Sequence, residues 1–391
     1  MQTVLQNSTE ILHSKFSTSA GFTEFYISSN SRDDSTFEEA LKELTDAYQF
    51  ALADMGLDRN TLQFTRVYVT DASNEFQTLL KSSLYEILQS GAVSVIQQSP
   101  LSGPVSILTY HIKDEKYPLR KDSVINDAKS AFQSVFSKGK FYNLLWTAQG
   151  CGEGPSSREQ TDNLFSQLSA TLEKNQMNLR DNTVRTWIYV RDIDNNYAGM
   201  VTARKELFSK IGLTDKTRYI ASTGIEGQVA RTSSLVSADS LSIGNLQEEQ
   251  IIRMEAPENL SSTIIYGVTF ERGLRIRFGD RSHLHISGTA SIDKNGEILY
   301  QGDIRRQTER TIENIEALLR PHNATLENMQ YLLLYVRNRK HYQFIQDILA
   351  EKLPATIPLI PVEGSVCRPG WLIEMEGLAI IEDSTHYPPF L

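Results

Sequence analysis

One strand-like segment near the end of the chain carries two acids in apolar surroundings. The segment WLIEMEGLAII spans residues 371–381 and places Glu374 and Glu376 among large apolar side chains. A carboxyl group that folding buries in such surroundings loses hydration, which raises its pKa and lets it keep a proton near neutral pH. A protonated carboxyl suits general acid catalysis, so Glu374 is the candidate acid. Alternatively, the segment is an edge strand with both glutamates on a wet face, which is the interpretation we prefer for Glu376.

Other reactive residue types lack the partners that their chemistry needs. Cys367 has no His at a spacing that suggests a catalytic dyad, so we expect it to line a pocket and not to act as a nucleophile. His283 and His285 alternate on a strand with no ligand cluster around them, and we predict no metal site. The sequence contains no P-loop and no G-x-S-x-G motif.

The strand that carries Glu374 closes the last of three repeats. Three stretches of equal length align without a gap, each an amphipathic helix pattern followed by a strand, at residues 36–71, 157–192 and 303–338. Each stretch opens on a residue that caps helices, namely Thr36, Ser157 or Asp303. In the first two, Glu39 and Gln160 follow three residues later and complete a capping box. Tyr68, Tyr189 and Tyr335 then share one strand position, which predicts three copies of one unit.

We predict further strands around each helix–strand pair, in the order ββ-α-β-α-ββ. A hairpin precedes each first helix, with a tight turn at Lys294-Asn295-Gly296 in the third copy. We divide the chain into repeats at residues 1–135, 136–260 and 261–391, with linkers near 114–140 and 244–280. Helices cover only one face of each sheet, so three sheets can cover one another by closing into a triangular barrel with the helices outside.

Composition narrows the class of protein and of partner. The chain has 391 residues, of which 40% are hydrophobic, and a formal net charge of −9. This length allows a sizeable core. A basic footprint for nucleic acid is absent, and no run approaches the ~18 apolar residues of a membrane span. We therefore expect a cytoplasmic protein without nucleic-acid or membrane partners, in which Cys151 and Cys367 stay reduced.

The third repeat resembles the Rid (RidA/YjgF) family. The likeness rests on HISGTASID, GDIRRQTERTIENIEALL, NATLENMQYLLLYV and LIEMEGLAII. Proteins of that family are trimers with ligand sites between neighbouring subunits. The resemblance implies an α+β fold in which three Rid/YjgF-like (chorismate-mutase-like) ββαβαββ repeats of one chain form an intramolecular pseudo-trimer. The chain would then be a monomer or a higher homo-oligomer of pseudo-trimers.

Within that superfamily, the region from residue 140 to 382 is similar to the chorismatases. The matching motifs are VRTWIYVRDI (184–193), ARKELF (203–208), YIASTGI (219–225), YGVTFERG (266–273), ISGTASI (286–292), GDIRRQTERTIENIEALL (302–319) and VCRPGWLIEMEG (366–377). Chorismatases release pyruvate from chorismate without a metal or organic cofactor. The resemblance implies a small carboxylate substrate, no cofactor, and Glu374 as the acid.

The same resemblance implies binding roles. Arg204, Arg272 and Arg368 match arginines of these motifs, and a guanidinium plane can hold a substrate carboxylate bidentately. Thr223 and Gly224 would lie in a strand-end turn at 222–224 that presents backbone N–H groups to an anion. Tyr266 and Cys367 would line the pocket. Plainer interpretations stay open, namely a surface ion pair for Arg204 and an ordinary turn at 222–224.

Release of pyruvate from chorismate starts with a proton on the methylene carbon of its enol ether. The oxocarbenium ion that forms is attacked by water or by the ring hydroxyl. The first two copies carry Thr109 or a neighbour, and Ser237, where the third has Glu374. We therefore expect one working site per chain, between the second and third copies.

Three alternatives remain. The first is an imine deaminase. Imine-deaminating Rid proteins use an Arg fifteen residues before the matching Glu, and this chain has Leu359 there, so the sequence gives this function less support. A non-catalytic Rid-like protein that binds a small carboxylate is the second alternative. A ribonuclease is the third, and the acidic net charge argues against it.

Overall fold

The fold consists of three six-stranded sheets with one topology, formed by the residues that the computed structural model describes, 4–6, 9–19, 21–114, 119–122 and 132–391. The strand orders are β1-β2-β3-β6-β4-β5, β7-β8-β9-β12-β10-β11 and β13-β14-β15-β18-β16-β17. In each sheet the last pair is parallel and the other pairs are antiparallel. The α+β fold of three repeats is therefore confirmed.

The elements follow one another in the same order in each repeat. The first contains β1 (Val4–Gln6), β2 (Thr9–Ser17), β3 (Phe22–Asn30), α1 (Phe37–Met55), β4 (Leu62–Val69), α2 (Ala72–Leu80), α3 (Ser83–Leu88), β5 (Ala92–Gln97) and β6 (Val105–Asp114). The second contains β7 (Arg120–Asp122), β8 (Gln133–Lys138), β9 (Asn143–Cys151), α4 (Ser157–Lys174), α5 (Leu179–Asn182), β10 (Thr183–Val190), α6 (Ile193–Lys210), β11 (Ala221–Glu226) and β12 (Val236–Gly244). The third contains β13 (Ile251–Arg253), β14 (Gly273–Arg277), β15 (Arg281–Ala290), α7 (Ile304–Leu319), β16 (Met329–Val336), α8 (Gln346–Lys352), β17 (Leu359–Glu363) and β18 (Ile373–Glu382). Short 3₁₀ turns complete it: η1 (Glu248–Gln250), η2 (Thr263–Tyr266), η3 (Arg320–His322), η4 (Leu326–Asn328) and η5 (Arg339–Phe344).

The three tyrosines that align in the sequence occupy equivalent positions in the sheets. Tyr68, Tyr189 and Tyr335 are each the second-last residue of their strand, β4, β10 and β16. Their antiparallel partners are Ser106, Ser237 and Glu374. In the first repeat the equivalent of Glu374 is therefore Ser106, three residues before the expected Thr109. In the second repeat the expected equivalent, Ser237, is confirmed.

Equivalent backbone groups join the three repeats in a ring. The amide of Gln97 donates to the carbonyl of Gln228 at 2.8 Å, which links the first repeat to the second. The amide of Glu226 donates to Ser365 O at 3.0 Å, and that of Glu363 to Ser99 O at 2.8 Å. Each donor is the residue after the parallel partner of an aligned tyrosine, and each acceptor lies two residues beyond an equivalent donor. Identical heterologous contacts that close after three steps define a pseudo-threefold axis.

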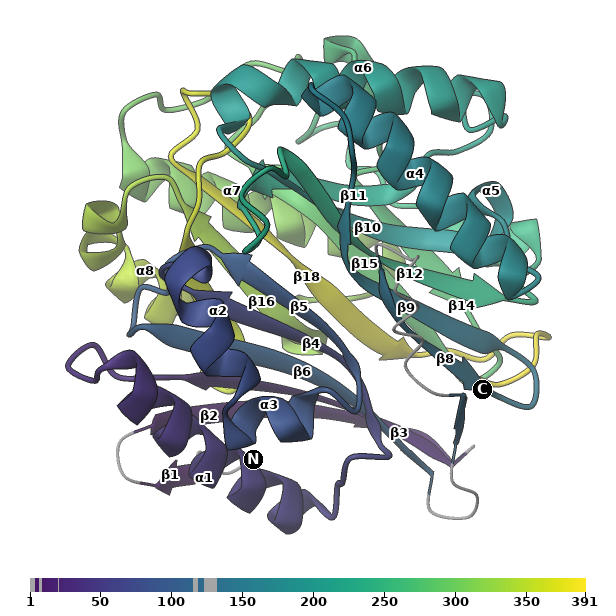
Figure 1. Cartoon of the computed structure of the whole chain (residues 1–391). Helices are drawn as coiled ribbons and strands as arrows, with labels where there is room; N and C mark the ends of the chain where they lie inside the picture. Colours follow the sequence, from purple (N-terminus) through teal and green to yellow (C-terminus); the bar gives the residue numbers. More distant parts are fainter. Residues whose placement is uncertain (1–3, 7–8, 20, 115–118, 123–131) are drawn as a thin grey trace.

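The sheets face one another and the helices lie outside them (Figure 1). A buried Arg–carboxylate pair crosses each of the three interfaces between sheets: Arg66 with Asp239, Arg185 with Glu376, and Arg281 with Glu24. Trp146, Trp187 and Phe64 stack beside these pairs in the apolar interior. The interior is therefore a packed core with a few charged cross-links.

Several predicted details differ from the structure. An additional edge strand opens each repeat, and the predicted linker at 244–280 contains β13 and β14. Residues 114–140 contain β7 and β8, although 115–118 and 123–131 lie outside the described residues.

Helix α4 is capped by Ser156 and not Ser157, while Thr36 and Asp303 cap as predicted. The turn at 294–296 follows β15 and closes only an isolated bridge, Ile292 to Ile298.

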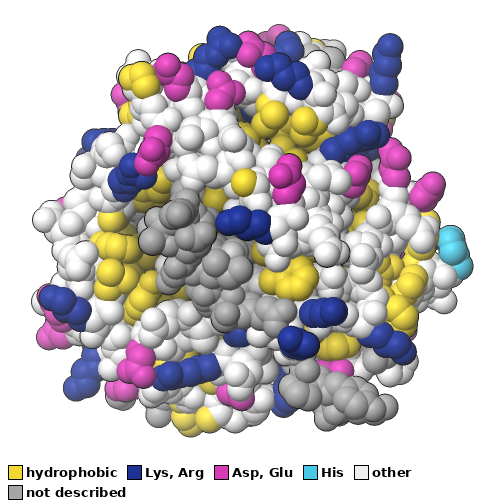
Figure 2. Space-filling model, turned by 45° about the vertical axis from the view of Figure 1, so that its right-hand side comes forward, with side chains coloured by type: hydrophobic (Ala, Val, Ile, Leu, Met, Phe, Trp, Pro, Cys, Tyr) yellow, Lys and Arg dark blue, Asp and Glu magenta, His cyan; other side chains and the backbone are white. Residues whose placement is uncertain are grey.

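Strand pairing also bears on where the repeats begin. β7 (Arg120–Asp122) belongs to the second sheet and β13 (Ile251–Arg253) to the third, so these two sheets begin before residues 136 and 261. The division into repeats at those residues stays a prediction. On the face shown in Figure 2, acidic and basic side chains are intermixed around small apolar patches. None of the described helices is both long and apolar enough to cross a membrane.

Candidate active site

Glu374 lies on β18, which is a central strand with β15 on one side and β16 on the other. Its side chain is 5% exposed and that of Glu376 is fully buried. The alternative of an edge strand with both glutamates on a wet face is therefore wrong. Burial and, to a smaller extent, the nearby charge of Glu376 raise the pKa of Glu374 to about 8, against the opposing charges of Arg272 and Arg185. Near neutral pH this carboxyl is predominantly protonated.

Glu376 is held in a network that fixes its charge beside Glu374. It accepts hydrogen bonds from Arg185, from the hydroxyl of Thr223, and from Tyr335 at 3.0 Å. The oxygen of Thr223 in turn accepts from the amide of Gly288 at 3.0 Å. These contacts join the second repeat to the third directly behind the candidate acid.

Gly288 makes room for the carboxyl group of Glu374. It sits in a β-bulge, where Ser287 and Gly288 together lie opposite Glu376. A Cβ atom on Gly288 would come within 2.3 Å of Glu374 Oε1 and 3.2 Å of the Thr223 methyl carbon. No side chain larger than hydrogen therefore fits with Glu374 in its present position.

Two of the predicted arginines lie in the same cavity as Glu374. Arg204, from α6, is 1% exposed and donates to Thr269 Oγ1 and to Ser222 Oγ, each at 3.3 Å. Arg272, which directly precedes β14, donates to Ser261 O at 3.1 Å. Arg204 is buried and not part of a surface ion pair, so that alternative is wrong. Each of the two guanidinium groups donates at least one hydrogen bond to a neutral oxygen of the chain.

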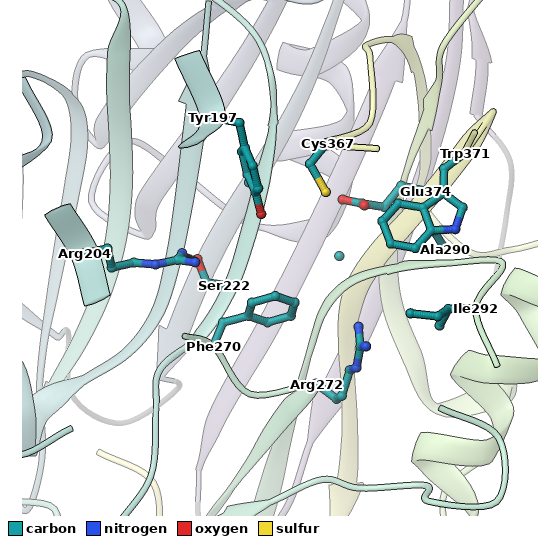
Figure 3. Close-up of a pocket in the computed structure, with 12 residues that line it drawn as sticks. Tyr197, Arg204, Ser222, Phe270, Arg272, Ala290, Ile292, Cys367, Trp371 and Glu374 are labelled. Carbon is teal, nitrogen blue, oxygen red and sulfur yellow. Dashed lines mark hydrogen bonds between the residues drawn. The ribbon is translucent and has the colours of Figure 1, made fainter. Parts of the chain in front are cut away.

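The cavity lies between the second and third repeats, where we expect the working site. Tyr197, Arg204, Ser222 and Gly224 line it from the second repeat, and Arg272, Gly288, Cys367 and Glu374 are among the residues from the third. Figure 3 shows Glu374, Cys367 and Tyr197 pointing into one space, with Phe270 between Arg204 and Arg272. The cavity has a volume of about 20 Å³, which is room for one ordered water.

The remaining predicted residues are placed differently. Arg368 stacks its guanidinium on Trp371 at 4.9 Å and donates to Gly296 O, outside the cavity lining. Thr223 binds Glu376, and residues 222–224 lie inside β11 and do not form a turn. Cys367 lines the cavity, and burial raises the pKa of its thiol to about 12, so it is a poor nucleophile. The side chain of Tyr266 lies outside the described residues.

The equivalent positions in the other repeats lack both the acid and the space. Ser237 and Ser106 replace Glu374. Gln149 occupies the bulge position of Gly288 in the second repeat, opposite Asp239, and its side chain accepts from Val95 N at 3.3 Å, across the interface with the first repeat. Glu374 and Gly288 therefore occur together only in the third repeat.

Sequence reasoning missed Tyr197, Phe270 and Gly288. Tyr197 is one of several apolar or aromatic residues on an amphipathic helix, and Phe270 was visible only within the motif YGVTFERG. The exclusion of a metal site stays a prediction. Among the described residues, no group of three or more His, Cys, Asp or Glu side chains lies together.

Comparisons with known proteins agree with this architecture. Residues 277–381 match the model of the family described as Endoribonuclease L-PSP. A RutC family protein of Pyrococcus abyssi (strain GE5 / Orsay) is 33% identical over 101 residues, which cover 25% of this chain and 79% of that protein. A chorismatase crystal structure superposes with a TM-score of 0.61 at 16% identity, over 90% of this chain and 98% of that one. At that identity the likeness shows a shared fold.

Proposed function

We propose that this chain, which belongs to the RutC family of Rid-like proteins, is an enzyme that releases pyruvate from chorismate or a related enol-pyruvyl carboxylic acid. One observation carries the proposal. A buried carboxyl, Glu374, with its pKa raised to about 8, lines a cavity between two repeats together with the cations Arg204 and Arg272. A proton donor and two cations in one enclosed site suit a substrate that is a dianion and must be protonated on carbon.

In this mechanism Glu374 donates its proton to the methylene carbon of the enol ether. The carbon–carbon double bond supplies the electron pair for the new C–H bond, and an oxocarbenium ion forms. Water adds to that ion, and the hemiketal divides into pyruvate and the ring alcohol while a proton returns to Glu374. One water is consumed and the carboxyl is regenerated. Arg204 and Arg272 bind the two substrate carboxylates.

The size of the cavity sets a condition on this proposal. Room for one water is far below the several hundred Å³ of typical ligand sites, so the site is closed. Phe270 lines the cavity and stands between the two arginines in the view of Figure 3. Substrate entry therefore requires side chains that line the cavity to move, and we propose that Phe270 is one of them.

The same closed cavity favours a second candidate, a Rid-like protein that binds a small carboxylate without turning it over. An imine deaminase has less support. Leu359 stands where that activity needs an Arg. It lies in β17, pairs with Leu332 of β16, and is not among the cavity-lining residues.

The test is incubation of the full chain with chorismate, with pyruvate measured by a coupled lactate dehydrogenase assay. Glu374→Gln is the inactive variant, and Glu382→Gln, at the exposed end of the same strand, is the matched control. Pyruvate from the wild type and the control but not from Glu374→Gln supports the enzyme. Saturable calorimetric binding of chorismate without pyruvate favours the second candidate, and neither binding nor turnover contradicts both.

A further inference from the structure

A second cavity opens where the three repeats meet at the pseudo-threefold axis. It lies beside the cyclic backbone hydrogen bonds that join Gln97, Glu226 and Glu363 to the next repeat. This axial cavity has a volume of about 490 Å³, against about 20 Å³ for the Glu374 cavity. That volume lies within the range of small-molecule sites.

Four of the five charged residues that line the axial cavity form two equivalent pairs. Glu226 and Glu363 occupy one position in the second and third repeats, where the first has the neutral Gln97. Arg191 and Arg337 occupy another, each directly after β10 or β16. All four line the cavity together with the exposed Asp192, so three carboxylates and two guanidinium groups face one space.

These side chains are held in place by the backbone around them. Glu226 accepts from Ser365 N at 3.2 Å through Oε2, and Glu363 accepts from Arg339 N at 3.2 Å through Oε1. Arg191 donates to Thr232 O, and Arg337 donates to Trp371 O at 3.2 Å and to Val366 O. The guanidinium of Arg337 also pairs with the carboxylate of Asp194 at 3.6 Å. Groups that are already oriented lose little conformational entropy when a ligand binds.

Gln98 adds an independent observation at the same place. The equivalent residues in the second and third repeats are Gly227 and Gly364, so only the first repeat places a side chain at this position of the cavity wall. Gln98 lines the cavity, is 2% exposed, and donates through Nε2 to Glu226 O at 2.5 Å. Its Oε1 is buried and has no hydrogen-bond partner among the described residues. A buried amide oxygen in that state favours a donor group nearby.

From this arrangement we propose that the axial cavity binds a small zwitterionic amino acid. The ammonium group of the ligand lies between Glu226 and Glu363, next to the amide of Gln98, and its carboxylate meets Arg191 and Arg337. Neither a simple anion nor a simple cation uses both kinds of group, because an anion would also meet the carboxylates and a cation would also meet the guanidinium groups. The axial site is separate from the Glu374 cavity and does not depend on the proposed reaction.

Isothermal titration calorimetry on the full chain tests this, with glycine and L-alanine as probes and acetate and methylamine as ligands that carry one charge only. We expect saturable binding of glycine or L-alanine, and at least tenfold weaker binding of both single-charge ligands. Absence of saturable amino-acid binding, or equal binding of acetate or methylamine, overturns the proposal.

Variants then locate the site. Glu363→Gln should weaken amino-acid binding about tenfold or more, whereas Arg158→Gln, at an exposed ion pair on α4, should leave it unchanged. Glu226→Gln replaces Glu363→Gln if the latter does not fold. Glu374→Gln should bind the amino acid as the wild type does, so failure of this proposal and failure of the proposed reaction are distinguishable. Wild-type affinity in the Glu363→Gln or Glu226→Gln protein contradicts the axial site.

Discussion

The raised pKa of Glu374 has a consequence for stability that does not depend on any substrate. A glutamate carboxyl has an ordinary pKa of 4.5, and in the folded chain the pKa is about 8. Below pH 4.5 the carboxyl is protonated in both states. Between pH 4.5 and about 8 the unfolded chain loses the proton and the folded chain keeps it, so the free energy of unfolding falls by about 1.4 kcal/mol per pH unit.

Glu374→Gln removes this contribution, since an amide of the same shape does not titrate. The difference in unfolding free energy, variant minus wild type, should therefore rise in favour of the variant by roughly 3 kcal/mol between pH 5 and pH 7.5. The measurement is urea unfolding of both proteins at four or five pH values. Comparing the two proteins at each pH cancels the other titrating groups.

The control is Glu39→Gln, which removes an exposed carboxyl in the capping box of α1. Its folded pKa is lowered by hydrogen bonds to Thr36, so it is ionised in both states across this pH range and its difference should stay constant. A constant difference for Glu374→Gln as well would mean that Glu374 is ionised in the folded chain near neutral pH. That result would refute its role as a general acid.

Three further predictions follow from the geometry. Gly288→Ala should preserve the fold but reduce pyruvate release at least tenfold, because its Cβ would displace the flexible carboxyl end of Glu374; wild-type turnover would contradict this. Arg185→Met should cost about 3–5 kcal/mol of unfolding free energy because the buried Glu376 loses its positively charged partner, and the double variant with Glu376→Met should recover most of it in urea unfolding. Ser156→Ala should cost about 1 kcal/mol through loss of the α4 cap, and an unchanged thermal midpoint would contradict that assignment.

The sequence predicted the fold well because the repeat is a local signal. Helix periodicity, cap residues and the Tyr-Val strand ends are all read within one stretch of chain, and three copies in register reinforce one another. The cap of α4 shifted by one residue because Ser156 and Ser157 are adjacent and both can cap. The edge strands β1, β7 and β13 were missed because three-residue strands carry too little periodicity to recognise.

The candidate site was predicted less completely because it depends on contacts between repeats. Glu374, Arg204 and Arg272 carry strong chemical types within motifs, and the structure brings them to one cavity. The importance of Gly288 comes from a bulge that only strand pairing reveals. The burial of Glu376 depends on Arg185, which reaches it from a different repeat.

Pseudo-symmetry explains how one of three clefts can differ without loss of the ring. Each interface has its own buried Arg–carboxylate pair and its own backbone link at the axis, so assembly does not depend on what fills a particular cleft. In the second repeat Gln149 fills the position of Gly288 beside Asp239, whereas in the third repeat glycine leaves that space to Glu374. The charge of Glu376, which helps to hold the second and third repeats together, also raises the pKa of Glu374. A contact that closes the ring therefore also helps to keep the candidate acid protonated, and at this interface stability and the proposed chemistry rest on the same carboxylate.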